Sequence, residues 1–136
     1  MLENDLTNYT SEEDFTVFKE ECNNWIRKFQ LNEWEVEYQH LLVEGCYAQC
    51  EYDYMSMSAR LKLSVDWRER PITDIALRKT AMHEICELLL AKLVVLANSR
   101  FIDHDSIDSE IHSIIHRIQN IVLNGREKQI DDSTTD

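Results

Sequence analysis

Three side chains that can hold a metal or move a proton lie within five residues of this 136-residue chain. His83 and Glu87 are four residues apart, so on a helix they share one face. Glu84 points about 100° away from His83 at 3.6 residues per turn. A histidine and a carboxylate suit zinc, and also manganese or iron. The pattern therefore predicts a metal site at His83 and Glu87, with Glu84 placed to accept a proton.

A structural explanation of the same three residues stands beside the chemical one. They lie within a stretch that is otherwise apolar, and burying ionisable groups without partners is costly. They are therefore exposed on one strip, paired with each other or with the next helix, or bound to a metal. Pairing at the edge of an apolar stripe and metal binding both remain open from the sequence.

Further candidate ligands lie in the segment that follows. His112 and His116 are four apart and share a helical face, whereas Glu110 falls on the opposite flank of the same apolar stripe. One flank, but not both, can meet His83. The sequence therefore allows two ligand sets, one with Glu110 and one with His112, to which His116 can be added.

The elements that position these residues follow from periodicity and capping signals. A capping-box pattern at residues 10–14 begins a helix over about residues 12–29. Residues 34–38, 46–54 and 59–65 alternate between apolar and polar side chains, which is typical of strands. Short connections between the three strands predict an antiparallel meander.

Two more helices are expected after Pro71. Thr73 or Asp74 caps an apolar helix that runs to about residue 96, and its composition predicts a central, buried position. Asp105 or Ser106 caps a third helix, which ends at 124–125. The fold class is therefore α+β, a three-stranded antiparallel sheet packed against three helices. Residues 1–10 are expected to be flexible, 11–125 to form one domain, and 126–136 to be a disordered polar tail.

Composition limits the classes of partner. The net charge of −12 disfavours nucleic acids and anionic membranes, and permits a basic protein partner. The longest apolar run, 88–97, contains Lys92 and is too short to span a bilayer. Four cysteines lack the Cys-x-x-Cys pairing of zinc knuckles, and we interpret them as small reduced hydrophobes in a cytoplasmic protein.

The run Thr80-Ala81-Met82-His83-Glu84-Ile85-Cys86-Glu87-Leu88-Leu89-Leu90 and the segment 110–118 together resemble the minimal zincin-like metallopeptidases found in bacteriophage genomes. The resemblance covers about residues 10–123. It implies zinc held by His83 and position 87, Glu84 as the base, a third ligand on the last helix, and the host cytoplasm as location. The chain departs from the His-Glu-x-x-His motif at Glu87, where the family has its second histidine.

Two functions from different classes follow. The first is a zincin-like metal-binding protein that acts as a zinc-dependent peptidase with a degenerate motif. The second is a catalytically inactive zincin-like scaffold without zinc, which binds a protein partner, such as a host factor, through its acidic surface.

Overall fold

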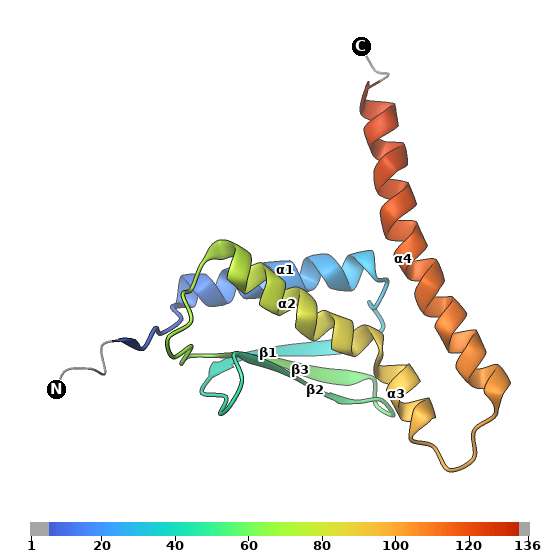
Figure 1. Ribbon diagram of the computed structural model, residues 1–136, viewed down its shortest axis with the longest axis horizontal. Coiled ribbons are helices and arrows are strands. Elements are labelled where there is room, and N and C mark those ends of the chain that lie inside the picture. Colours follow the sequence, from blue (N-terminus) through green and yellow to red (C-terminus); the bar gives the residue numbers. More distant parts are fainter. Residues whose placement is uncertain (1–5, 134–136) are drawn as a thin grey trace.

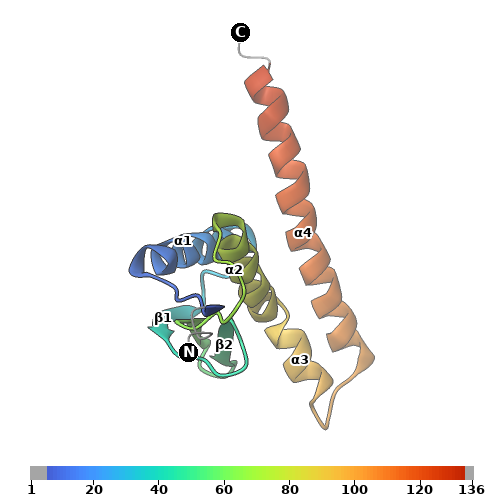
Figure 2. The same cartoon turned by 60° about the vertical axis from the view of Figure 1, so that its left-hand side comes forward.

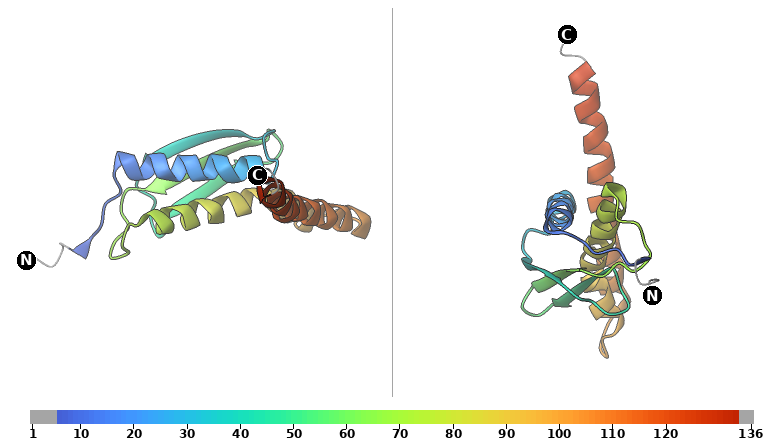
Figure 3. Two further views of the ribbon diagram at one scale, coloured as in Figure 1. Left: turned by 90° about the horizontal axis from the view of Figure 1, so that it is seen from above. Right: turned by 90° about the vertical axis from the view of Figure 1, so that its left-hand side faces the viewer.

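The computed structural model describes residues 6–133, and it confirms the α+β class. Two helices, α1 (Glu12–Lys28) and α2 (Asp74–Leu89), lie side by side on one face of the sheet, and the other face is uncovered (Figures 1 and 3). The remaining elements are β1 (Glu35–Leu41), β2 (Ala48–Asp53), β3 (Ser58–Ser64), α3 (Ala91–Ala97) and α4 (His104–Ser133).

The sheet is mixed, so the prediction of a wholly antiparallel meander is wrong. The strand order is β1-β3-β2, with β3 parallel to β1 and antiparallel to β2. Alternating side chains fix which residues face the core, but they do not fix strand order. Neighbouring strands are about 4.8 Å apart, so a connection that passes over one strand must cross about 10 Å. The connection 42–47 is long enough to do so.

Ser64, at the end of the central strand, holds this connection in place. Its backbone amide donates to the carbonyl of Tyr47 at 2.9 Å, and its hydroxyl accepts from the amide of Val43 at 3.2 Å. The next amide, of Val65, donates to the carbonyl of Leu41 at 3.0 Å. The end of β3 is therefore bonded to both ends of the connection, which fixes where β2 begins.

The core lies between the sheet and the two helices. Leu61 and Leu63 of β3 point toward the helices and are fully buried, as are Phe18 of α1 and Ile85 of α2. On the opposite face of the sheet the alternate residues are charged or polar, among them Glu37 and Arg60. The period-two pattern thus places one apolar layer inward and one polar layer toward solvent.

The capping signals are confirmed at the two helices that cover the sheet. Ser11 caps α1, and its side chain and that of Asp14 exchange hydrogen bonds with each other's backbone amides. Thr73 caps α2 by accepting from the amide of Ala76 at 3.1 Å. The first helix was predicted over about residues 12–29, and α1 ends at Lys28, one residue earlier.

The predicted second helix is broken in two. Leu90, with φ −91° and ψ 0°, ends α2 and precedes α3, where one helix to residue 96 was expected. The predicted central, buried position holds for one face of this segment only, because Ile75, Met82 and Val94 are exposed. A two-layer fold covers only one face of each outer helix, so the apolar residues on the other face remain in contact with solvent.

The last helix extends away from the sheet (Figures 1 and 2). It packs against α3 and buries Glu110 and Ile114, and it continues through Gly125 to Ser133, beyond the predicted stop. The residues predicted as a disordered tail lie partly in α4 and partly outside the described residues. An apolar stripe on its free face stays exposed: Ile111, Ile115, Ile118 and Val122.

Residues 8–10, predicted to be flexible, are bonded to the chain beyond β3, while 1–5 lie outside the described residues. The amide of Asn8 donates to the carbonyl of Arg68 at 2.6 Å, and the amide of Trp67 donates to the carbonyl of Asn8 at 2.9 Å. The Thr10 hydroxyl donates to the carbonyl of Ser64 at 2.8 Å. Backbone groups make most of these hydrogen bonds. Side-chain patterns in the sequence therefore did not predict that residues 8–10 are held in place.

Replacing Leu61 by alanine tests this core. The side chain is fully buried at the centre of the sheet, so Leu61→Ala should lower the free energy of unfolding by about 2–5 kcal/mol. Ile75→Ala is the matched control, because Ile75 is 64% exposed and its removal should change stability by less than about 0.5 kcal/mol. Urea unfolding followed by far-ultraviolet circular dichroism measures both, and equal losses would contradict the placement of the core.

Candidate functional site

His83, Glu84 and Glu87 lie together on α2, as the sequence predicts. One ligand atom from each of the three lies within 4.8 Å of the others. His83 Nε2 is 3.4 Å from Glu87 Oε2. Within residues 6–133, no other group of three His, Cys, Asp or Glu side chains meets this criterion. The side chains of His83 and Glu87 are largely exposed, whereas Glu84 points into the protein.

The face of α2 that packs on the sheet carries Glu84 into the interior. Its neighbours on that face, Ala81, Ile85 and Leu88, are buried in the core. Glu84 itself is only 5% exposed, and its Oε1 has no hydrogen-bond partner. A buried carboxyl oxygen without a partner is unusual, because most buried polar atoms in proteins are hydrogen-bonded. It therefore points to a missing partner.

Burial raises the pKa of Glu84 to about 8. The nearby carboxyl of Glu87 contributes to this rise by charge repulsion and by a hydrogen bond, and the backbone amide of Cys50 partly opposes it. Two carboxyl groups this close favour sharing a proton or binding a cation. The raised pKa favours the protonated form of Glu84 near neutral pH in the absence of a cation.

A cavity of about 440 Å³ opens beside these three residues. The rest of its wall comes from the start of β2, which is an edge strand, from the two residues before it, from Arg70, and from Lys79 and Thr80 of α2. The lining residues outside the cluster are Cys46, Tyr47, Ala48, Arg70, Lys79 and Thr80. The cavity thus places the candidate metal site next to an edge strand of the sheet and next to two positively charged side chains, those of Arg70 and Lys79.

Arg70 is held at this cavity by aromatic rings. Its guanidinium carbon lies 4.6 Å from the ring centroids of both Tyr47 and Trp67. Its Nη1 also donates to the hydroxyl of Thr80 at 3.3 Å. These contacts tie the start of β2 to the first half of α2, and they place a positive charge on the cavity wall.

The candidate ligands on the last helix do not join the cluster. Glu110 is buried in a different place, where its Oε1 lies 3.6 Å from Nζ of Lys92 on α3. His112 and His116 are exposed on α4, and neither belongs to the group of ligand atoms around His83. The main contact of α4 is with α3, which follows α2 in the chain. The side chains of α4 therefore lie away from His83 and Glu87.

Sequence reasoning missed Cys46. The residue was expected in the strand over 46–54 as a small reduced hydrophobe, but β2 begins only at Ala48. Cys46 is exposed in the connection before β2, and its thiol is free. The other three cysteines, Cys22, Cys50 and Cys86, are wholly or partly buried as predicted. Gly45, directly before Cys46, was the available signal, because a turn glycine ends the strand pattern there.

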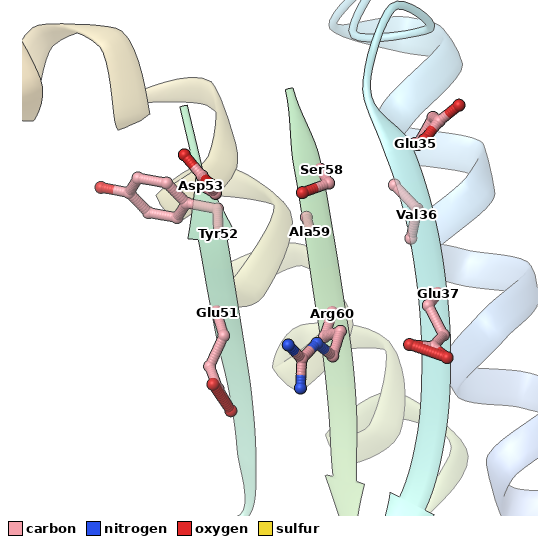
Figure 4. Close-up of a pocket in the computed structure, with 9 residues that line it drawn as sticks. All are labelled: Glu35, Val36, Glu37, Glu51, Tyr52, Asp53, Ser58, Ala59 and Arg60. Carbon is pink, nitrogen blue, oxygen red and sulfur yellow. The ribbon is translucent and has the colours of Figure 1, made fainter. Parts of the chain in front are cut away.

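A second hollow, of about 340 Å³, lies on the uncovered face of the sheet (Figure 4). Arg60 of β3 is paired in register with Glu37 on one side and Glu51 on the other. Lys62 forms an ion pair with Glu51. The charged groups of this surface are exposed or already paired, so it resembles a solvated sheet face more than a reaction site.

The residues of the cluster fit a divalent cation. A cation held by His83 and Glu87 would relieve the repulsion between the carboxyl groups of Glu87 and Glu84, and a water beside that cation would be the partner that Oε1 of Glu84 lacks. His83 adds a nitrogen ligand of the kind zinc prefers. The chain's own ligand set of one nitrogen and one or two carboxyl oxygens is still small for a stable site.

No family model, curated protein or solved structure matches the chain. In residues 6–133, every helix is too short or too polar to cross a membrane.

The pKa of Glu84 predicts how stability depends on pH. The folded state keeps a proton that the unfolded state releases above about pH 4.5, so metal-free wild type should lose stability as pH rises from 4.5 to 8. Glu84→Gln cannot ionise. Its stability should therefore exceed that of wild type by a growing margin, on the order of 1 kcal/mol or more at pH 8, or roughly 3–5 °C in Tm.

Thermal unfolding in chelator at several pH values measures this margin. Glu20→Gln, at an exposed position on α1, is the matched control and should follow wild type. A margin that stays constant across the range would show that Glu84 does not titrate between the two pH limits.

Proposed function

We propose that this protein is a zincin-like, metal-dependent hydrolase of peptides, in which His83 and Glu87 hold the metal and Glu84 is the base. The single observation that carries the proposal is the unpartnered, buried Oε1 of Glu84 beside Glu87 at the wall of a cavity. A cluster that only paired charges at the surface would not require a buried carboxyl group at its centre.

The position of the cavity supports a peptide as the substrate. The start of β2, the edge strand of the sheet, forms one of its walls. An extended peptide can add to such an edge through main-chain hydrogen bonds. The peptide would then lie alongside α2, with a carbonyl group near His83 and Glu87.

Each residue of the cluster has a role in this proposal. The metal, when bound, supplies Lewis-acid polarisation of the carbonyl. Glu84 accepts a proton from the attacking water and passes it to the leaving amine. A carboxyl group whose pKa is raised toward neutrality is suited to both transfers. Arg70 and Lys79 supply positive charge on the same cavity wall.

The replacement Glu84→Gln tests the base. It keeps the shape of the side chain and removes its proton chemistry, so kcat/KM should fall at least about 100-fold while zinc stays bound. Hydrolysis of a fluorescent casein by the zinc-loaded protein measures activity, and elemental mass spectrometry measures the metal. Glu20→Gln should retain full activity. Equal activity of wild type and Glu84→Gln would rule out this mechanism.

An inactive scaffold that binds a protein is the second candidate, and one observation favours it. The free face of α4 exposes Ile111, Ile115, Ile118 and Val122, a stripe at helical spacing without an intramolecular partner among the described residues. Partner helices bind such stripes. A zinc-loaded wild type with no hydrolysis of casein, under conditions that detect a control peptidase, would favour this candidate over the first.

A further inference from the structure

The proposed metal site lacks a third protein ligand, because α4 directs Glu110 toward Lys92. Catalytic zinc sites usually have three protein ligands and one open position. We propose that Cys46 is the third ligand, so that the metal is held by the thiolate of Cys46, the imidazole of His83 and the carboxylate of Glu87. This assignment rests on the proposed function and completes its site.

Cys46 lies on the wall of the same cavity as the cluster. Cys46, His83, Glu84 and Glu87 all line it, and Cys46 is the only cysteine of the described residues that does. Its thiol is free and exposed. Glu84, which lines the same cavity, supplies an independent observation, since it is 5% exposed and its Oε1 has no partner. Thus a soft ligand and an unsatisfied carboxyl group face one space.

Cys46 lies between an anchored residue, Tyr47, and a residue with a free backbone environment, Gly45. On the anchored side, the carbonyl of Tyr47 accepts from the amide of Ser64 at 2.9 Å and from Nε1 of Trp67 at 3.2 Å. On the adjustable side, Gly45 has φ +79° and nothing within 4 Å of a Cβ position. The thiol lies outside the 4.8 Å group. We therefore expect the backbone at Gly45 to rotate and to bring the thiol inward when the metal binds.

The donor set explains why Glu87 can replace a histidine. Zinc binds thiolate sulfur, imidazole nitrogen and carboxylate oxygen, and a thiolate is its strongest ligand of the three in most sites. The thiol of Cys46 loses its proton to solvent when the sulfur–metal bond forms, so binding releases one proton at this position. Glu84 then remains free of the metal to act on water.

Cobalt substitution tests the assignment without an activity assay. The full-length, metal-free protein, purified without a histidine tag, is titrated with cobalt(II) chloride, and the absorption spectrum is recorded. A thiolate ligand produces an intense near-ultraviolet charge-transfer band. Wild type should show this band, and Cys46→Ser should lose it. Cys86→Ser is the matched control, because Cys86 is on α2 but outside the cavity lining, and it should keep the band.

Competition with a chromophoric chelator gives the zinc affinity of the same variants. Cys46→Ser should bind zinc at least roughly 100-fold more weakly than wild type, a larger loss than most changes outside the ligand set cause. Zinc should also slow the alkylation of Cys46 by iodoacetamide in wild type, but not in His83→Ala, as followed by peptide mass mapping. This second readout does not require a mutation at Cys46.

The outcomes separate the two proposals. Cobalt bound with visible bands but without the thiolate band, or a band that survives in Cys46→Ser, would overturn the role of Cys46 and leave the site at His83 intact. No cobalt or zinc binding by wild type would overturn the metal site itself, and the assignment of Cys46 with it.

Discussion

The contact between α2 and the inner face of the sheet determines both the core and the candidate site. Ile85 and Leu88 can be buried only if that face of α2 lies on the strands, and Glu84 lies on the same face. The hydrophobic contact therefore forces one carboxyl group into the interior. The helix keeps His83 and Glu87 at the surface one turn apart, so a buried acid and two exposed ligands meet at one cavity.

Much of the fold could be predicted because local patterns carry it. The capping signals at residues 10–14 and at Thr73 or Asp74 correspond to the caps Ser11 and Thr73, and alternation identifies all three strands. Strand order could not be predicted, because it depends on the path of the connection 42–47 and on the hydrogen bonds of Ser64, not on periodicity. The break between α2 and α3 at Leu90 could not be predicted, because no glycine or proline lies near it in the sequence.

The candidate site was predictable to the extent that it lies on one helix. Spacing alone places His83 and Glu87 on one face and turns Glu84 away from it. A ligand from elsewhere in the chain depends on tertiary structure, and so the choice between Glu110 and His112 could not be settled from the sequence. The structure places Glu110 beside Lys92, and it places Cys46, interpreted from the sequence as a buried hydrophobe, at the cavity.

The central claim is that the buried carboxyl group of Glu84 marks a cation site formed with His83 and Glu87. Elemental mass spectrometry of the protein, purified without a histidine tag or added metal, tests it most directly. We expect close to one zinc or other transition metal per chain, and its loss in His83→Ala. A wild-type protein without metal, whose melting temperature does not change when zinc is added, would contradict the account.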